Sequence, residues 1–264
     1  MSAGPQRWLV EWQAPASAPL LLVCLPHAGS GAVQFRAWQE FAGPGIGVVA
    51  VQLPGRENRW REEPATRAED VVEALVPALA ARLDRPYVVF GHSMGALLGY
   101  EVARALGSRS GQWPLAVVAS ACRAPDDQGE PTGAAGRSDR DLVAELAADG
   151  AVPEHVVAND KLVSLLGRPL RADLTLCDRY LPPAAHRRLP CPVHAWRGSA
   201  DLGVTDGHAR RWRAWSAVPG GLRRFDGGHL YHLGRPAEVV DALRRLGADA
   251  LTAAPEPVKE TAEH

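Results

Sequence analysis

The sequence lacks a segment able to cross a membrane, an excess of basic charge, and paired cysteines of the kind that bind metal. Its longest apolar run, residues 20–25, is far shorter than the roughly 20 residues of a membrane-spanning helix. Residues 1–7 lead into no signal-peptide pattern. The 29 Lys and Arg residues balance 30 Asp and Glu, which argues against nucleic-acid binding, because phosphate contacts need a basic excess. The four cysteines form no C-x-x-C pair. We therefore expect a cytoplasmic protein without a bound metal or cofactor.

Short apolar runs without polar alternation recur along the chain, as in strands buried on both faces of a parallel sheet. These predicted strands cover residues 20–25, 48–53, 87–90, 115–120, 193–196 and 222–225. The stretches between them with the apolar spacing of helices are 68–83, 96–106 and 236–246. The alternation predicts an α/β fold with a mostly parallel sheet flanked by helices.

Residues 126–188 break this alternation. A loop rich in Gly, Asp and Pro covers 126–138. Three short helices are expected after it, at 139–148 with Ser138 or Asp139 as N-cap, at 159–166 and at 170–180. Helices inserted between two sheet strands suit a lid over a substrate site. We therefore predict one domain over residues 1–246, with a lid at about 126–188, and a disordered tail over 247–264.

A candidate nucleophile lies in Gly91-His-Ser-Met-Gly95, which matches the pattern G-x-S-x-G. The segment follows the expected strand 87–90 and precedes the expected helix at 96–106, which is the context of a nucleophile elbow. The flanking residues must be small because strand and helix approach closely at such a turn. We therefore predict that Ser93 is the nucleophile, with its Oγ exposed at the carboxyl edge of the sheet.

A serine hydroxyl needs a base to take its proton. His229 is the best candidate, because it follows Gly227-Gly228 just after the expected strand 222–225. His232 is the reserve. The side chain of His92 is expected to point away from the position of the base. The remaining histidines lie in loops, a strand, the predicted lid or the end of the chain: His27, His155, His186, His194, His208 and His264.

An acid should orient the histidine and stabilise its imidazolium form. In the chain order Ser, Asp, His, it must lie between Ser93 and His229 and follow a strand. Asp201 fits both conditions. Asp206 precedes a helix-like run and is better interpreted as an N-cap, and Asp226 belongs to the same loop as His229.

Two backbone N–H groups should form an oxyanion hole. Met94, the residue after the nucleophile, is expected to supply one of them. The second should come from the loop Pro26-His-Ala-Gly-Ser-Gly31, where we expect the N–H of Ala28 to serve. From spacing alone, this loop is equally well explained as an ordinary Gly-rich turn.

These segments resemble the type II thioesterases that accompany modular polyketide synthases and nonribosomal peptide synthetases, within the thioesterase branch of the α/β-hydrolases. The resemblance follows the family order from about Leu20 to His232. Its most specific segments are Gln52-Leu-Pro-Gly-Arg-Glu57 and Gly91-His-Ser-Met-Gly-Ala96. The other matching segments are Leu25-Pro-His-Ala-Gly29, Phe35-Arg-Ala-Trp38, Tyr100-Glu101, Ala124-Pro125, Leu170-Arg-Ala-Asp173 with Tyr180, and Gly227-Gly-His229.

The resemblance implies an α/β-hydrolase fold with Ser93, Asp201 and His229 as catalytic triad and Ala28 and Met94 as oxyanion donors. It implies an enzyme that hydrolyses acyl thioesters on the phosphopantetheine arm of an acyl or peptidyl carrier protein, through an acyl-enzyme. We expect this enzyme to be a monomer. Such an enzyme removes aberrant or stalled acyl groups. The lid helices would then form the acyl chamber.

Two departures from the family pattern leave the preferred acyl group open. Leu230 follows the catalytic histidine where the family usually has Phe, and the first loop reads His27-Ala-Gly-Ser-Gly31 instead of His-Ala-Gly-Gly-Ser. Alternatives are a chain-releasing or medium-chain fatty-acyl thioesterase, a carboxylesterase or lipase of the same fold, and a catalytically silent carrier binder.

Four arginines either face an acidic carrier protein or simply form a solvated surface. They are Arg168, Arg171, Arg187 and Arg188.

Overall fold

The computed structural model describes residues 7–148, 150, 152–182 and 188–253. Its strands form one seven-stranded sheet in the order β1-β3-β2-β4-β5-β6-β7. Only β1 runs antiparallel to its neighbour, and all other pairs in the sheet are parallel. The strands are β1 (Leu9–Val10), β2 (Leu20–Leu25), β3 (Ile46–Val51), β4 (Tyr87–His92), β5 (Ala116–Ser120), β6 (Val193–Gly198) and β7 (Leu222–Phe225).

Burial on both faces explains the continuous apolar runs of the central strands. Every residue of β2, β3, β4 and β5 is buried, so these strands carry no polar alternation. All six predicted strands are present, and their ends differ from the predicted ones by at most two residues. The edge strand β1 was not predicted, because two residues are too few to show a pattern. The expected α/β fold is confirmed.

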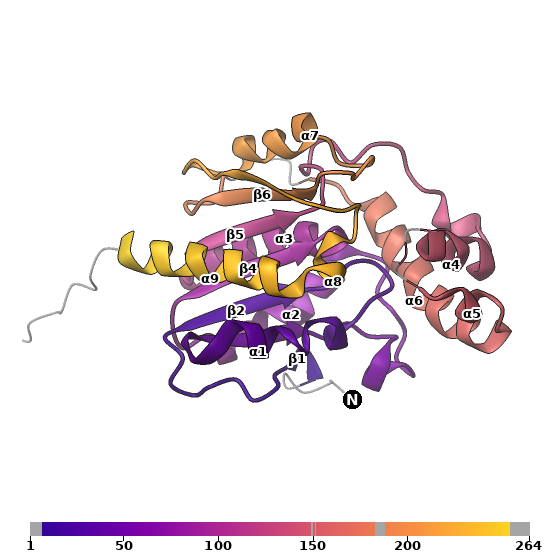
Figure 1. Cartoon of the computed structure of the whole chain (residues 1–264), viewed down its shortest axis with the longest axis horizontal. Helices are drawn as coiled ribbons and strands as arrows, with labels where there is room; N and C mark the ends of the chain where they lie inside the picture. Colours follow the sequence, from indigo (N-terminus) through magenta and orange to yellow (C-terminus); the bar gives the residue numbers. More distant parts are fainter. Residues whose placement is uncertain (1–6, 149, 151, 183–187, 254–264) are drawn as a thin grey trace, which may run out of the picture.

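Helices cover both faces of the sheet (Figure 1). On β2, alternate residues point to opposite faces: Leu21, Val23 and Leu25 pack with α2 and α3, whereas Leu20, Leu22 and Cys24 pack with α1 and α9. The helices are α1 (Trp38–Ala42), α2 (Ala68–Arg82), α3 (Met94–Ser110), α4 (Asp139–Ala148), α5 (Glu154–Val157), α6 (Asp160–Arg179), α7 (Asp206–Arg210), α8 (Tyr231–Gly234) and α9 (Pro236–Ala253). No helix in the described part of the chain is long and apolar enough to cross a membrane.

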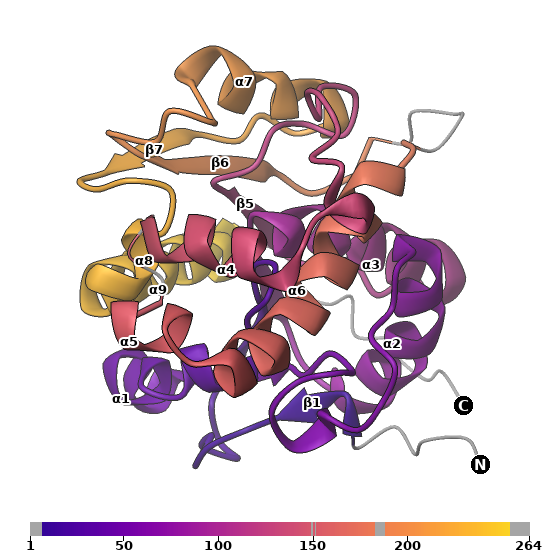
Figure 2. The same cartoon turned by 90° about the vertical axis from the view of Figure 1, so that its right-hand side faces the viewer.

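Helices α4, α5 and α6 gather at one end of the sheet, beyond the ends of the strands, where they face the viewer in Figure 2. The prediction for α4 is confirmed, and the Ser138 hydroxyl caps it by accepting the N–H of Asp141. The two further helices predicted at 159–166 and 170–180 are wrong, because they form the single helix α6. Pro169 removes one backbone donor, but Val163 and Leu170 on either side of it are buried in the same core, which keeps the helix continuous.

The predicted disordered tail at 247–264 is wrong for its first part, because α9 continues to Ala253. Gly247 packs so closely on the sheet that a Cβ there would lie 2.3 Å from Cδ2 of Leu20. Leu251 also packs against the core on this face. These contacts extend the helix into a segment whose composition alone indicates no structure. Residues 254–264 lie outside the described residues.

Candidate active site

Ser93 lies on a sharp turn between β4 and α3, with φ +53° and ψ −121°. A non-glycine residue rarely adopts a positive φ, and this conformation is typical of a nucleophile elbow. The turn is tight enough that a Cβ on Gly91 would lie 2.0 Å from the carbonyl oxygen of Gly95. A Cβ on Gly95 would lie 2.3 Å from the carbonyl oxygen of Leu25. Both positions therefore accept only glycine without a backbone shift.

The structure brings Ser93, His229 and Asp201 together from the ends of three parallel strands. Nε2 of His229 lies 3.1 Å from Oγ of Ser93. Nδ1 of the same ring lies 2.9 Å from Oδ2 of Asp201. These distances allow a proton to pass from the serine hydroxyl to the imidazole while the carboxylate fixes the ring.

The Asp201 carboxylate is held from both sides. Its side chain is 1% exposed, and Oδ1 accepts the backbone N–H groups of Gly203 and Val204 at 2.9 and 3.1 Å. Burial raises the pKa of this carboxyl, but the hydrogen bond and charge of His229 and the two N–H donors outweigh it and hold the pKa below its ordinary value. An ionised Asp201 keeps the Nδ1 proton of His229 on its own side, which leaves Nε2 free to accept the proton of Ser93.

The rival acids lie elsewhere. Asp226 is exposed and pairs with Arg235. Asp206 pairs with Arg197 and Arg224 in the first turn of α7. The prediction that Asp206 is an N-cap is wrong by one position, because the Thr205 hydroxyl accepts the N–H of the third helical residue instead.

His232, the reserve base, is fully buried and bonds the side chain of Gln34 rather than Ser93. His194 lies in β6 and accepts the N–H of Gly221. Neither imidazole faces the nucleophile, so His229 is the histidine that the fold places beside Ser93. His186 and His264 lie outside the described residues.

Sequence reasoning missed a buried hydrogen-bond chain behind the triad. Nε2 of His92 lies 2.9 Å from the backbone carbonyl oxygen of His229, which can only accept, so this nitrogen carries the proton. Nδ1 then accepts from the Ser120 hydroxyl at 2.9 Å, and Ser120 accepts from the Tyr231 hydroxyl at 2.6 Å. Burial lowers the pKa of His92 well below its ordinary value, which keeps this ring neutral.

The two expected oxyanion donors lie beside the nucleophile. Ala28 lines the same hollow as Ser93, and Met94 is the first residue of α3, where the helix N-terminus favours negative charge. Within the described part of the chain, no acceptor binds either backbone N–H. Both groups are therefore available to a ligand at Ser93.

The hollow at Ser93 has a volume of about 170 Å³. One wall comes from the loop of residues 26–31 after β2 and from Leu230, which follows the candidate base. The opposite wall comes from α4 and α6, so these two inserted helices cover one side of the hollow at Ser93. Its lining side chains are mostly aliphatic, namely Leu142, Leu146, Leu170, Leu174 and Leu230, together with Ala28, His27 and Glu145.

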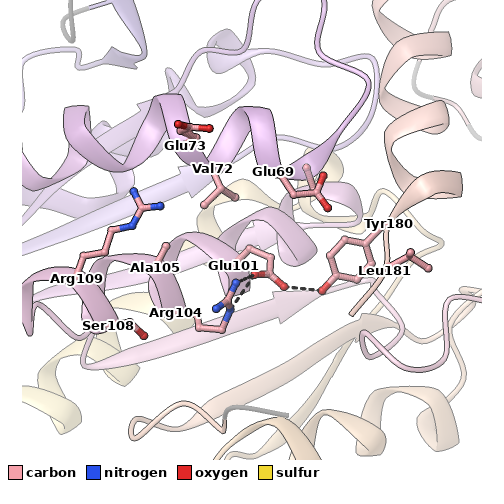
Figure 3. A pocket seen from close by; sticks show the side chains of 11 residues that line it. Glu69, Val72, Glu73, Glu101, Arg104, Ala105, Ser108, Arg109, Tyr180 and Leu181 are labelled. Atoms are coloured by element: carbon pink, nitrogen blue, oxygen red, sulfur yellow. Dashed lines mark hydrogen bonds and ion pairs between the residues drawn. The ribbon is translucent and has the colours of Figure 1, made fainter. Parts of the chain in front are cut away.

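A larger hollow of about 430 Å³ lies between α2, α3 and the end of α6 (Figure 3). At its floor, Glu101 accepts the hydroxyl of Tyr180 at 2.8 Å and pairs with Arg104. Ser93 and His229 line the smaller hollow and not this one. The size of a hollow therefore does not identify the site here, and the arrangement of reactive groups does.

Side chains with metal-binding or carrier-binding potential are mostly occupied. Among the described residues, no three His, Cys, Asp or Glu side chains are grouped as metal ligands. Arg168 pairs with Glu63, and Arg171 pairs with Asp139. Arg188 is exposed, and Arg187 lies outside the described residues. The four cysteines, Cys24, Cys122, Cys177 and Cys191, are free thiols.

Comparison with known proteins gives a consistent result. The family model described as "Thioesterase domain" matches residues 21–246. The gramicidin S biosynthesis protein GrsT of Aneurinibacillus migulanus is 32% identical over 225 residues, which are 85% of this chain and 88% of that protein. The solved type II thioesterase BorB from the borrelidin biosynthetic cluster superposes with a TM-score of 0.83 at 33% identity, covering 91% of this chain and 97% of BorB. RedJ, a thioesterase of the prodiginine pathway in Streptomyces coelicolor, gives a TM-score of 0.81 at 36% identity, covering 88% and 92% of the two chains.

Proposed function

This chain belongs to the thioesterase family and is a thioester hydrolase, and we propose that it removes short acyl groups from carrier proteins through a Ser93–His229–Asp201 triad. Its similarity to GrsT, BorB and RedJ supports a type II thioesterase of polyketide or nonribosomal peptide biosynthesis. The observation that carries the proposed mechanism is the hydrogen-bonded arrangement of the three side chains at the elbow.

In the proposed acylation step, the Ser93 hydroxyl attacks the thioester carbonyl while Nε2 of His229 takes its proton. The negative oxygen of the tetrahedral intermediate lies between the N–H groups of Ala28 and Met94. The carbon–sulfur bond then breaks, and the phosphopantetheine thiolate leaves with the proton that His229 returns. Because thiolate is a good leaving group, this protonation contributes less than it does in amide hydrolysis.

Deacylation repeats the same steps with water. His229 takes a proton from water, the resulting hydroxide attacks the acyl-Ser93 ester, and the same two N–H groups hold the oxyanion. The carbon–oxygen bond to Ser93 breaks, and His229 returns the proton to the serine. The products are a carboxylic acid and a free carrier thiol, so Ser93, His229 and the two N–H groups complete the cycle.

The size of the chamber supports removal of short acyl groups over release of a full-length product. At about 170 Å³ it is smaller than the roughly 300–1,000 Å³ of pockets that enclose drug-sized ligands. Its aliphatic lining from α4 and α6 suits a short hydrocarbon chain. A small chamber also fits an editing role, because stalled groups are smaller than a completed polyketide or peptide.

The test is hydrolysis of acetyl, butyryl, octanoyl and decanoyl groups on a phosphopantetheinylated carrier protein, beside the corresponding ethyl esters. We expect acetyl and butyryl thioesters to react fastest and the Ser93→Ala variant to lose roughly 10³-fold or more in kcat. Unchanged turnover in Ser93→Ala would overturn the triad. Faster hydrolysis of decanoyl thioesters would favour a medium-chain or chain-releasing enzyme, and faster hydrolysis of the ethyl esters would favour a carboxylesterase.

A further inference from the structure

Asp173 of the lid helix α6 reaches across to the loop that carries the candidate oxyanion donor Ala28. Its side chain is 2% exposed, and its Oδ2 accepts the backbone N–H of Gly29 at 2.8 Å. The same carboxylate forms a two-point pair with Arg56, in which Nη2 lies 2.8 Å from Oδ1 and Nη1 contacts Oδ2. A residue of the lid is therefore bonded to the peptide group next to Ala28.

The loop around Ala28 is a tight turn with two possible orientations of its central peptide. Its ends are joined by the N–H of Ser30, which donates to the carbonyl of His27 at 3.1 Å. Gly29 has φ +79°, which is the value that a type II turn requires at its third residue. Type I and type II turns differ by a flip of the central peptide, and here that peptide carries the N–H of Gly29. The bond to Asp173 therefore holds the turn in the type II form.

Arg56 fixes the same turn from its other side. Its Nη1 donates to the carbonyl of Ser30 at 3.1 Å, and its Nε and Nη2 donate to the carbonyl of Pro54. Both Arg56 and Asp173 are buried, and a buried ion pair contributes little net stability because desolvation offsets its attraction. The pair is therefore better explained by where it places the turn than by the stability that it adds.

We propose that Asp173 is a positioning residue that sets the oxyanion hole, so that docking of the lid helix and correct placement of the Ala28 N–H are one event. The inference rests on the proposed triad mechanism. Packing agrees with it, because a Cβ on Gly29 would lie 3.1 Å from Cδ1 of Leu170, one turn before Asp173 on α6. The helix that closes the acyl chamber also completes the site for the transition state.

The same helix has a second polar anchor that provides a matched control. Tyr180, directly after α6, donates its hydroxyl to Glu101 of α3 at 2.8 Å in a buried contact (Figure 3). This hydrogen bond holds the C-terminal end of α6 against α3, and it does not involve the turn at Ala28. Loss of this hydroxyl should affect only the C-terminal end of α6 and leave the Asp173–Gly29 bond, and with it the oxyanion hole, in place.

The experiment compares Asp173→Asn and Tyr180→Phe in steady-state hydrolysis of butyryl-N-acetylcysteamine. We expect Asp173→Asn to lose about 10- to 100-fold in kcat with KM changed less than about threefold, because the oxyanion forms only in the transition state. Binding of butylboronic acid, whose adduct with Ser93 is tetrahedral, should weaken by a similar factor. Tyr180→Phe should keep kcat and boronate affinity within about threefold.

A second variant keeps the test valid if Asp173→Asn folds poorly with Arg56 left unpaired. Arg56→Met combined with Asp173→Leu removes both buried charges, which proteins tolerate well, but it leaves Gly29 N–H without its acceptor. It should fold and still lose kcat and boronate affinity. Wild-type kcat in this folded double variant, or equal losses in Tyr180→Phe, would overturn the proposal. An active Ser93→Ala enzyme would instead refute the triad itself, so the two failures are distinguishable.

Discussion

Nε2 of His92 donates a hydrogen bond to the backbone carbonyl of His229 across 2.9 Å, so the residue before the nucleophile holds the loop of the base. The ring of His92 also stacks on His232 with centroids 3.8 Å apart. Ser93 and His229 thus depend on one buried side chain for their relative position. His92 therefore has a structural role, which is to fix the position of His229 relative to Ser93.

Replacing His92 with Phe should therefore lower both activity and stability. The change leaves the carbonyl of His229 without a donor and the hydroxyl of Ser120 without its acceptor, and an unsatisfied buried group costs about 1–3 kcal/mol. We expect kcat to fall about 10-fold because the base is less well placed. Tyr231→Phe, which removes only the outermost hydroxyl of the chain, should keep kcat within about threefold. Equal kcat losses in both variants, measured beside urea unfolding, would contradict the role of His92.

The residue after the base should set acyl preference. Leu230 lines the chamber of about 170 Å³, and Phe at this position would occupy part of it. We expect Leu230→Phe to lower kcat/KM about 10-fold more for butyryl thioesters than for acetyl thioesters. Each additional methylene of the acyl chain changes binding in a hydrophobic pocket by about 1–3 kcal/mol. Leu174→Ala on the opposite wall should favour longer chains. A butyryl-to-acetyl ratio that Leu230→Phe leaves unchanged would show that the chamber lies elsewhere.

The close backbone contacts of Gly91 and Gly95 at the elbow predict that one added methyl group lowers the free energy of unfolding strongly. Gly95→Ala places a Cβ 2.3 Å from the carbonyl oxygen of Leu25, and backbone cannot move aside as a side chain does. We expect a loss of about 1–3 kcal/mol or more in the free energy of unfolding. Gly136→Ala, where a Cβ meets nothing within 4 Å, is the matched control and should change stability by less than about 0.5 kcal/mol. Similar urea midpoints for the two variants would refute the close packing.

Local patterns predicted the strands and the candidate triad, because each depends on signals within a few residues. The runs of β2 to β5 are apolar on both faces, and the G-x-S-x-G segment stands directly between a strand and a helix. The His92–His229 and Asp173–Gly29 bonds join residues 137 and 144 positions apart, and no periodicity marks such pairs. The predicted break between residues 166 and 170 is wrong, because burial on both sides of Pro169 keeps α6 continuous against the local preference.

A cluster of buried imidazoles should make the fold sensitive to mild acid. His27 and His92 both pack against His232, with centroids 5.5 and 3.8 Å from its ring. Burial, aided by the charge of His229, lowers the pKa of His27 to about 4, and burial lowers the pKa values of His92 and His232 well below the ordinary value. Below about pH 6.5, these three histidines therefore bind protons in the unfolded chain but stay neutral in the folded chain.

Stability should consequently fall as pH drops from about 6.5 towards 4, by up to about 1.4 kcal/mol per pH unit for each of the three histidines. Asp201 acts in a different window: its lowered pKa contributes stability above the ordinary carboxyl pKa, and that contribution is lost only below about pH 4. Urea unfolding at about pH 7.5, 6.5 and 5.5 measures the slope. The His232→Gln variant has one buried imidazole fewer and should show a shallower slope. A free energy of unfolding that stays constant from pH 7.5 to 5.5 would mean that water reaches these rings in the folded protein and that they take up protons there.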